Sequence, residues 1–175
     1  VNNVDIRGGA PFAINQDNPS RLQKFDAIDF GENTKGQWMH GSDFLIRTCK
    51  NNNVPILTTT GKRQCIIITQ SQGTSSDKGP FISNTYIDGV LKNTCILPGG
   101  NCIYGCQKIV TYDKGTWFAV IGPRLYYPNS NTQAGHFVGT VHLSALFNKT
   151  LTQTEITKIY NNNPFNTSIL NPTIL

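Results

Sequence analysis

The chain has 175 residues, of which 38% are hydrophobic and 14% are charged, and its formal net charge at pH 7 is +5. This length and apolar content suffice for one folded domain that buries roughly 70% of its unfolded surface. Glycine and proline are abundant but not periodic, which excludes a collagen-like or a disordered chain.

The basic residues are spread singly along the chain, and Lys62-Arg63 is the only adjacent pair. Nucleic-acid-binding proteins gather such residues on one surface, so we expect no nucleic acid partner. No apolar run approaches the roughly 20 residues of a membrane-spanning helix, so we expect no membrane insertion. The chain begins at Val1 and not at Met, so the sequence is compatible with a leader peptide or an upstream part of a larger parent protein.

Turn signals divide the chain into short segments of a single domain, residues 1–175. Residues 1–20 have little periodicity and predict an extended lead-in with at most one short strand, whereas residues 164–175 predict a tail or an edge strand. Between them, β-branched and alternating apolar residues predict these strands: Leu22–Phe30, Asp43–Cys49, Gln64–Gln70, Phe81–Ile87, Val90–Cys95, Ile109–Tyr112 and Thr116–Ile121.

Asp88-Gly89 separates two of these strands by two residues, which is the signal of a type I′ hairpin turn. The positive φ angles of such a turn account for Asp88 without a catalytic or calcium-binding role. The consecutive residues Ile66, Ile67 and Ile68 predict a strand that is covered on both faces.

A last strand and a helix are predicted near the end of the chain. Across Thr140–Phe147 the odd positions are apolar and most even positions are polar, which places one face of a strand on a core. Thr152 and Glu155 have the spacing of a capping box, with Leu151 and Ile156 as a hydrophobic staple, and the asparagines before Pro164 end the helix. With roughly ten short strands and one helix, the fold class is all-β.

A family resemblance is carried by the stretch from Gly135 to Tyr160, which reads G-H-F-V-G-T-V-H-L-S-A-L-F-N-K-T-L-T-Q-T-E-I-T-K-I-Y. It resembles the closing segment of laminin G-like, concanavalin A-like jelly rolls of the lectin/glucanase superfamily. Trp117–Leu125, Tyr86–Val90 and Phe25–Phe30 resemble earlier strands of that family, so the resemblance covers about half of the chain. It implies an antiparallel β-sandwich, a jelly roll, with one short C-terminal helix. Calcium at the rim of the fold would also follow from the resemblance, but no ligand set matches, so we assign no cofactor and no metal.

The residues that catalysis on such a fold needs are missing. Glycoside hydrolysis requires two carboxylates on either side of one bond, whereas the spacing of three between Asp26, Asp29 and Glu32 makes Asp26 and Asp29 point to opposite faces of a strand. A nucleophile elbow, an H-E-x-x-H motif and a phosphate-binding loop are also absent. We therefore expect that the protein is not an enzyme, and a divergent polysaccharide-cleaving enzyme is the second alternative.

Binding has better candidates. The stretch from Leu125 to Gln133 joins two predicted strands and carries aromatic rings beside amide side chains, a combination that sugars use for stacking and hydrogen bonding. A second aromatic loop follows Gly36. The candidate ligand-binding residues are Tyr126, Tyr127, Asn129, Asn131, His136, Trp38 and His40.

The cysteines predict disulfides in preference to a zinc site, because no C-x-x-C motif and no neighbouring histidine occur. A hairpin would bring Cys49 within reach of Cys65, and the odd number leaves one thiol unassigned. The disulfide candidates are Cys49, Cys65, Cys95, Cys102 and Cys106. Sequons make Asn148 and Asn166 glycosylation candidates, and Asn93-Thr94-Cys95 is a weaker sequon.

These features together predict a non-catalytic recognition or adhesion domain of an extracellular, cell-surface or virion-surface protein, with a glycan or glycoprotein bound through rim loops. The alternative is a structural or assembly module of a viral capsid, spike or fibre, for which a homo-oligomer is expected.

Overall fold

The computed structural model describes residues 9–16, 25–32, 34–42, 55, 60–72, 81–97, 115, 117–127 and 132–163. For residues 42, 72, 81, 97, 124–127 and 132–134 the description is limited to the backbone. The predicted strands Asp43–Cys49 and Ile109–Tyr112 and the tail 164–175 lie outside these ranges.

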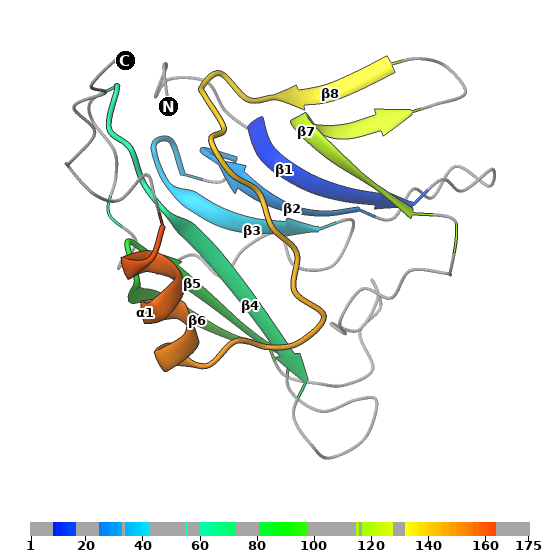
Figure 1. Ribbon diagram of the computed structural model, residues 1–175. Coiled ribbons are helices and arrows are strands. Elements are labelled where there is room, and N and C mark those ends of the chain that lie inside the picture. Colours follow the sequence, from blue (N-terminus) through cyan, green and yellow to red (C-terminus); the bar gives the residue numbers. More distant parts are fainter. Residues whose placement is uncertain are drawn as a thin grey trace, which may run out of the picture.

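The described residues form two antiparallel sheets and one short helix (Figure 1). The larger sheet has the strand order β3-β2-β1-β7-β8, with β1 at Gly9–Gln16, β2 at Phe25–Phe30, β3 at Trp38–Ser42, β7 at Trp117–Tyr127 and β8 at Thr132–His136. The smaller sheet has the order β4-β5-β6, with β4 at Ile66–Gln72, β5 at Phe81–Ile87 and β6 at Val90–Leu97. The helix α1 spans Gln153–Asn161.

Strand β1 lies in the part of the chain that the sequence predicts as a lead-in. It is the central strand of the larger sheet, paired with β2 on one side and with β7 on the other. The part of the chain in which we expect at most one short strand therefore supplies the central strand of the larger sheet.

Three apolar clusters show how the layers pack. One lies between the two sheets, where Phe30 and Trp38 of the larger sheet meet Ile87 of the smaller sheet. A second lies between the smaller sheet and the helix, where Tyr86 meets Leu151 and Ile156. The third, on the larger sheet, contains Ala10, Ala13, Phe25 and Ala27 with Val120 packed against them.

The smaller sheet is thus the middle layer between the larger sheet and α1. Its strand β4 contributes Ile66 to the cluster between the sheets and Ile67 to the cluster under the helix. Neighbouring residues of a strand point to opposite faces, so the prediction that β4 is covered on both faces is confirmed.

The predicted hairpin turn is confirmed. Asp88 and Gly89 join β5 to β6 with φ angles of 53° and 77°, as a type I′ turn requires. Asp88 also ties the turn to the residue before β4: its Oδ1 accepts a hydrogen bond of 2.9 Å from the backbone N–H of Cys65, and its own N–H donates to the carbonyl oxygen of Cys65 at 2.9 Å. Asp88 therefore both forms the hairpin turn and binds the backbone of Cys65 just before β4.

The predicted capping box of α1 is also confirmed. The side chain of Thr152 accepts a hydrogen bond from the backbone N–H of Glu155 at 3.3 Å, and the carboxylate of Glu155 accepts one from the Thr152 N–H at 2.8 Å. Leu151 and Ile156 are buried together on the smaller sheet, so the start of the helix is held both by hydrogen bonds and by packing.

The predicted strand Thr140–Phe147 is wrong. Segment 137–152 belongs to neither sheet and runs as a coil from β8 across the front of both sheets to α1 (Figure 1). Leu143 and Phe147, which the alternation places on a core, are 63% and 45% exposed. An alternating pattern shows which side chains can share a face, but a strand also needs a neighbouring strand for its backbone groups, and neither sheet supplies one here.

Candidate functional site

An open apolar surface on β7 is the first candidate site. In the register between β1 and β7, Ala13 pairs with Val120, and Val120 packs into the cluster of Ala13, Phe25 and Ala27. The neighbouring positions Trp117, Ala119 and Ile121 point to the opposite face, because side chains alternate along a strand. We call Trp117, Ala119 and Ile121 the β7 surface.

The side chains of the β7 surface are exposed. The exposed fractions are 47% for Trp117 and 62% for Ile121, and Ala119 is also exposed. The same face of the sheet is buried farther along, where Phe30 and Trp38 pack against Ile87 of the smaller sheet. Three strands are narrower than five, so the smaller sheet covers the β2–β3 side and leaves β7 open.

Trp38 and His40 lie in strand β3 and not in the predicted aromatic loop, and both are buried. Trp38 is 6% exposed, its ring centroid lies 4.8 Å from that of Phe30, and its Nε1 donates a hydrogen bond of 2.8 Å to Oε1 of Gln64. His40 is 8% exposed. Both residues belong to β3, and their side chains point towards the smaller sheet.

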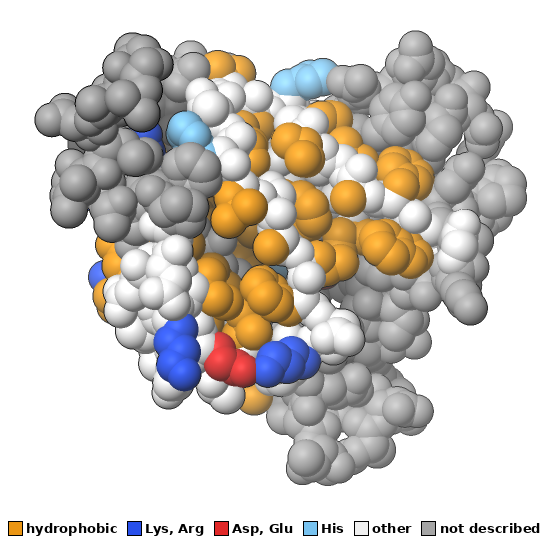
Figure 2. All heavy atoms as spheres, viewed as in Figure 1, with side chains coloured by type: hydrophobic (Ala, Val, Ile, Leu, Met, Phe, Trp, Pro, Cys, Tyr) orange, Lys and Arg blue, Asp and Glu red, His pale blue; other side chains and the backbone are white. Residues whose placement is uncertain are grey.

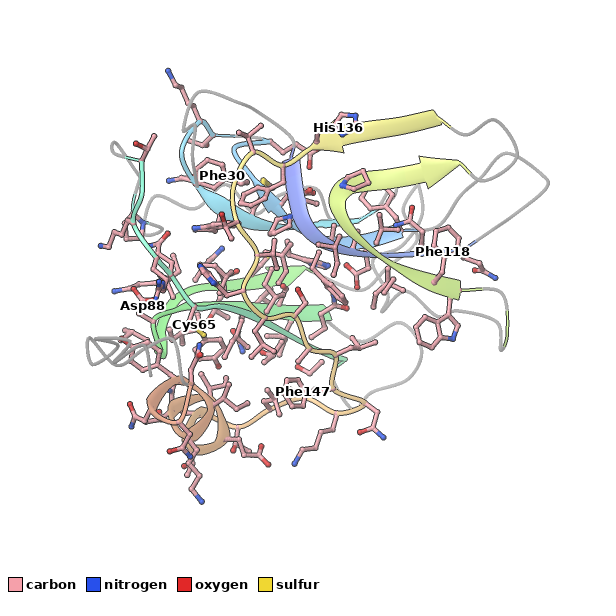
Figure 3. The ribbon with its side chains drawn as sticks, turned by 45° about the horizontal axis from the view of Figure 1, so that its top comes forward. Phe30, Cys65, Asp88, Phe118, His136 and Phe147 are labelled. Carbon is pink, nitrogen blue, oxygen red and sulfur yellow. The ribbon has the colours of Figure 1, made fainter. Side chains whose placement is uncertain are left out.

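Among the other candidate ligand-binding residues, the structure describes the side chain of His136 alone. The side chain of His136 is exposed at the end of β8, away from the core residue Phe30 (Figure 3). His136 pairs with Pro123, whereas Tyr127 pairs with Thr132 at the other end of the β7–β8 hairpin. For Tyr126 and Tyr127 the description is limited to the backbone, and Asn129 and Asn131 lie outside the described residues.

A polar cluster between the two sheets was not predicted from the sequence. Nε2 of His40 contacts Oδ1 of Asp26, and Nε2 of Gln70 donates a hydrogen bond of 2.7 Å to Oδ2 of Asp26. Oγ of Ser83 lies 3.5 Å from Nδ1 of His40. A carboxylate only accepts hydrogen bonds, so Nε2 of His40 is the donor to Asp26. We call Asp26, His40, Gln70 and Ser83 the inter-sheet cluster.

The inter-sheet cluster contains the three groups of a serine hydrolase triad, but its geometry favours a structural role. In such a triad the serine faces Nε2 of the histidine and the carboxylate faces Nδ1; here Ser83 faces Nδ1 and Asp26 faces Nε2. Ser83 is 3% exposed, so its hydroxyl is closed off between the sheets. The cluster joins β2 and β3 of one sheet to β4 and β5 of the other.

Two further carboxyl groups, those of Asp29 on β2 and of Glu32 just after this strand, lie near Gly41 of β3. A Cβ atom placed on Gly41 would come within 1.8 Å of Oδ2 of Asp29 and 3.3 Å of Oε2 of Glu32. Asp29 is fully buried, and its carboxylate lies in the space that a side chain at position 41 would need. Glycine at this position therefore allows both acidic side chains to lie against β3.

The prediction that Cys65 forms a disulfide is wrong, because its thiol is free. Burial raises the pKa of this thiol, and the charge of Asp88 raises it further, whereas a hydrogen bond with Asn163 lowers it. Figure 3 shows Cys65 beside Asp88 at the hairpin turn. Cys95 is buried and disulfide-bonded. The remaining cysteines, which lie outside the described residues, are Cys49, Cys102 and Cys106.

Asn148 of the first sequon is exposed in the bend before α1, and Asn166 lies outside the described residues. Within the described ranges, no group of three or more His, Cys, Asp or Glu side chains could hold a metal ion. The helix in the described part of the chain lacks the length and apolar character needed to cross a membrane.

Comparison with known proteins found no matching family model, no matching curated protein and no matching solved structure.

Proposed function

We propose that this chain is a non-catalytic recognition domain of the laminin G-like, concanavalin A-like jelly-roll class that binds a glycan or glycoprotein at an extracellular, cell or virion surface. Two antiparallel sheets followed by a capped helix are compatible with that class. The observation that carries the proposal is the β7 surface, where Trp117, Ala119 and Ile121 are exposed on one face.

An exposed indole suits a sugar ligand for a physical reason. The C–H faces of a pyranose stack on an aromatic ring, and the ring of Trp117 is available for this because no described residue covers it fully. Ile121 lies four residues after Trp117 on the same face of β7, so it extends the apolar surface along the strand. The net charge of +5 adds a positive field, which favours acidic glycans over neutral ones.

The test uses the two tryptophans of the chain, one buried at position 38 and one exposed at position 117. The protein is screened on a glycan array, and the strongest hits are titrated while tryptophan emission and acrylamide quenching are recorded. We expect a hit to protect Trp117 from acrylamide, and Trp117→Ala to weaken binding about tenfold or more, as for a central aromatic contact.

Val90→Ala is the matched control, because Val90 is an exposed apolar side chain (53%) on β6, away from the β7 surface. It should leave binding unchanged. An array without hits, or a glycan that binds Trp117→Ala as well as the unaltered protein, would refute the proposal.

A structural or assembly module of a capsid, spike or fibre stays the alternative proposal. The exposed apolar side chains of segment 137–147 support it, because assembly subunits cover such side chains with their neighbours.

A further inference from the structure

The coil between β8 and α1 exposes large apolar side chains that the described part of the chain leaves uncovered. Val138, Leu143, Leu146 and Phe147 have exposed fractions of 37%, 63%, 56% and 45%. Figure 2 shows hydrophobic side chains gathered over the centre of the face that this coil crosses. Residues 137–147 are called the crossing segment below.

Hydrogen bonds hold the crossing segment at its two ends. The backbone N–H of Phe137 donates a hydrogen bond of 2.8 Å to the carbonyl oxygen of Gly122 on β7. Just beyond the segment, Oγ1 of Thr150 donates one of 2.5 Å to the carbonyl oxygen of Gln70 on β4. Between these anchors the segment belongs to neither sheet.

The sequence of the crossing segment is that of a strand. Val141, Leu143, Ala145 and Phe147 alternate with polar residues, apart from Leu146. A charge, a proline or a bulge usually protects an exposed strand from pairing with another chain. No Lys, Arg, Asp or Glu occurs between Arg124 and Lys149, and no proline occurs in the crossing segment.

We propose that the crossing segment is an interface at which it pairs, as an antiparallel strand, with the crossing segment of a second copy of this chain. The charge distribution supports this occupant: the chain has a net charge of +5, so two copies repel each other generally, but they can meet at a segment that has no charged residue.

Two-fold symmetry fits the alternation. A symmetry axis at Ser144 sets Leu143 opposite Ala145 and Val141 opposite Phe147, and an axis at Leu143 sets Leu143 opposite itself. In both registers the apolar side chains of both copies share one face, where opposite and diagonal neighbours touch. Pairing also adds backbone hydrogen bonds between the two copies.

The inference is tested by sedimentation and multi-angle light scattering of the full chain over a range of concentrations. We expect the mass to double, and hydrogen exchange at residues 140–147 to slow as the dimer forms. Leu143→Lys and Leu143→Glu should each give a monomer, because like charges then meet across the two-fold axis. An equal mixture of the two variants should restore the doubled mass.

Leu91→Lys is the matched control, since Leu91 is an exposed apolar residue (43%) on β6, and it should keep the dimer. Emission from the buried Trp38 reports whether each variant is folded. A chain that stays monomeric at all concentrations, an equal loss of dimer with Leu91→Lys, or a failure of the mixed variants to associate would each overturn the inference. Trp117→Ala should retain the dimer. A failure of the glycan-binding proposal would therefore leave the dimer proposal intact, and the reverse also holds.

Discussion

Gln70 on β4 donates a hydrogen bond of 2.7 Å from Nε2 to Oδ2 of Asp26 on β2, a residue 44 positions earlier in the chain. This bond connects the smaller sheet to the larger one. Because the carboxylate of Asp26 also contacts His40 on β3, one acidic group holds three strands together.

Removal of this bond should destabilise the fold. Gln70→Ala leaves a half-buried carboxylate oxygen without its donor, and we expect the free energy of unfolding to fall by about 1–3 kcal/mol. Urea denaturation measures the change. In a double-mutant cycle with Asp26→Ala the two losses should not add, because both variants break the same contact. Lys158→Ala, at an exposed helix position, is the control for stability. Additive losses from the Gln70 and Asp26 variants would contradict the contact between these two residues.

The hairpin turn allows a second test. Gly89→Ala places a Cβ in a backbone conformation with φ of 77° and 3.1 Å from the ring of Tyr160. Gly61 has nearly the same φ, 78°, with nothing within 4 Å. Gly61→Ala should therefore cost about 1–2 kcal/mol for the left-handed conformation alone. Gly89→Ala should cost about 1 kcal/mol more, because the ring of Tyr160 must move. Equal thermal-unfolding shifts would show that Tyr160 does not press on the turn.

The carboxyl group of Glu155 should titrate far below its ordinary range. A hydrogen bond from Lys149, and further ones from the backbone and side chain of Thr152, lower its pKa from 4.5 to about 2. A group whose pKa is lowered by folding stabilises the protein above its unfolded pKa. The contribution of Glu155 is therefore complete above pH 4.5 and is lost as the pH falls towards 2.

Carboxyl-carbon NMR titration measures this pKa directly. Lys149→Gln removes the largest cause and should raise the pKa of Glu155 towards 4.5, whereas Lys158→Gln in the last turn should leave it unchanged. Glu155→Gln should flatten the dependence of stability on pH between about 4.5 and 2. A pKa near 4.5 in the unaltered protein would show that the cap is not formed in solution.

Cys65 should react slowly with alkylating reagents. Its thiolate is the reactive form, and burial and the charge of Asp88 both raise the thiol pKa. At pH 8 we expect iodoacetamide to modify the Cys65 peptide more slowly than free cysteine, as followed by mass spectrometry. Asp88→Asn removes one of the two causes and should accelerate the reaction, while burial keeps it slower than that of free cysteine. A rate equal to that of free cysteine would contradict a half-buried thiol.

Elements whose signals lie within a few residues of one another could be predicted from the sequence. The capping box of Thr152 and Glu155 joins residues three apart, and the turn at Asp88 and Gly89 needs only two residues that accept positive φ. Such features depend on local backbone geometry, so residue type and spacing are enough to predict them.

Which apolar and aromatic side chains are buried depends instead on how the sheets pack. Trp38 and His40 are covered because the smaller sheet lies over β3, and Trp117 is exposed because that sheet does not extend to β7. Leu143 and Phe147 have the alternation of a core strand, yet neither of the two described sheets pairs with them. Burial and strand pairing depend on which distant segment lies alongside, and no local pattern contains that information.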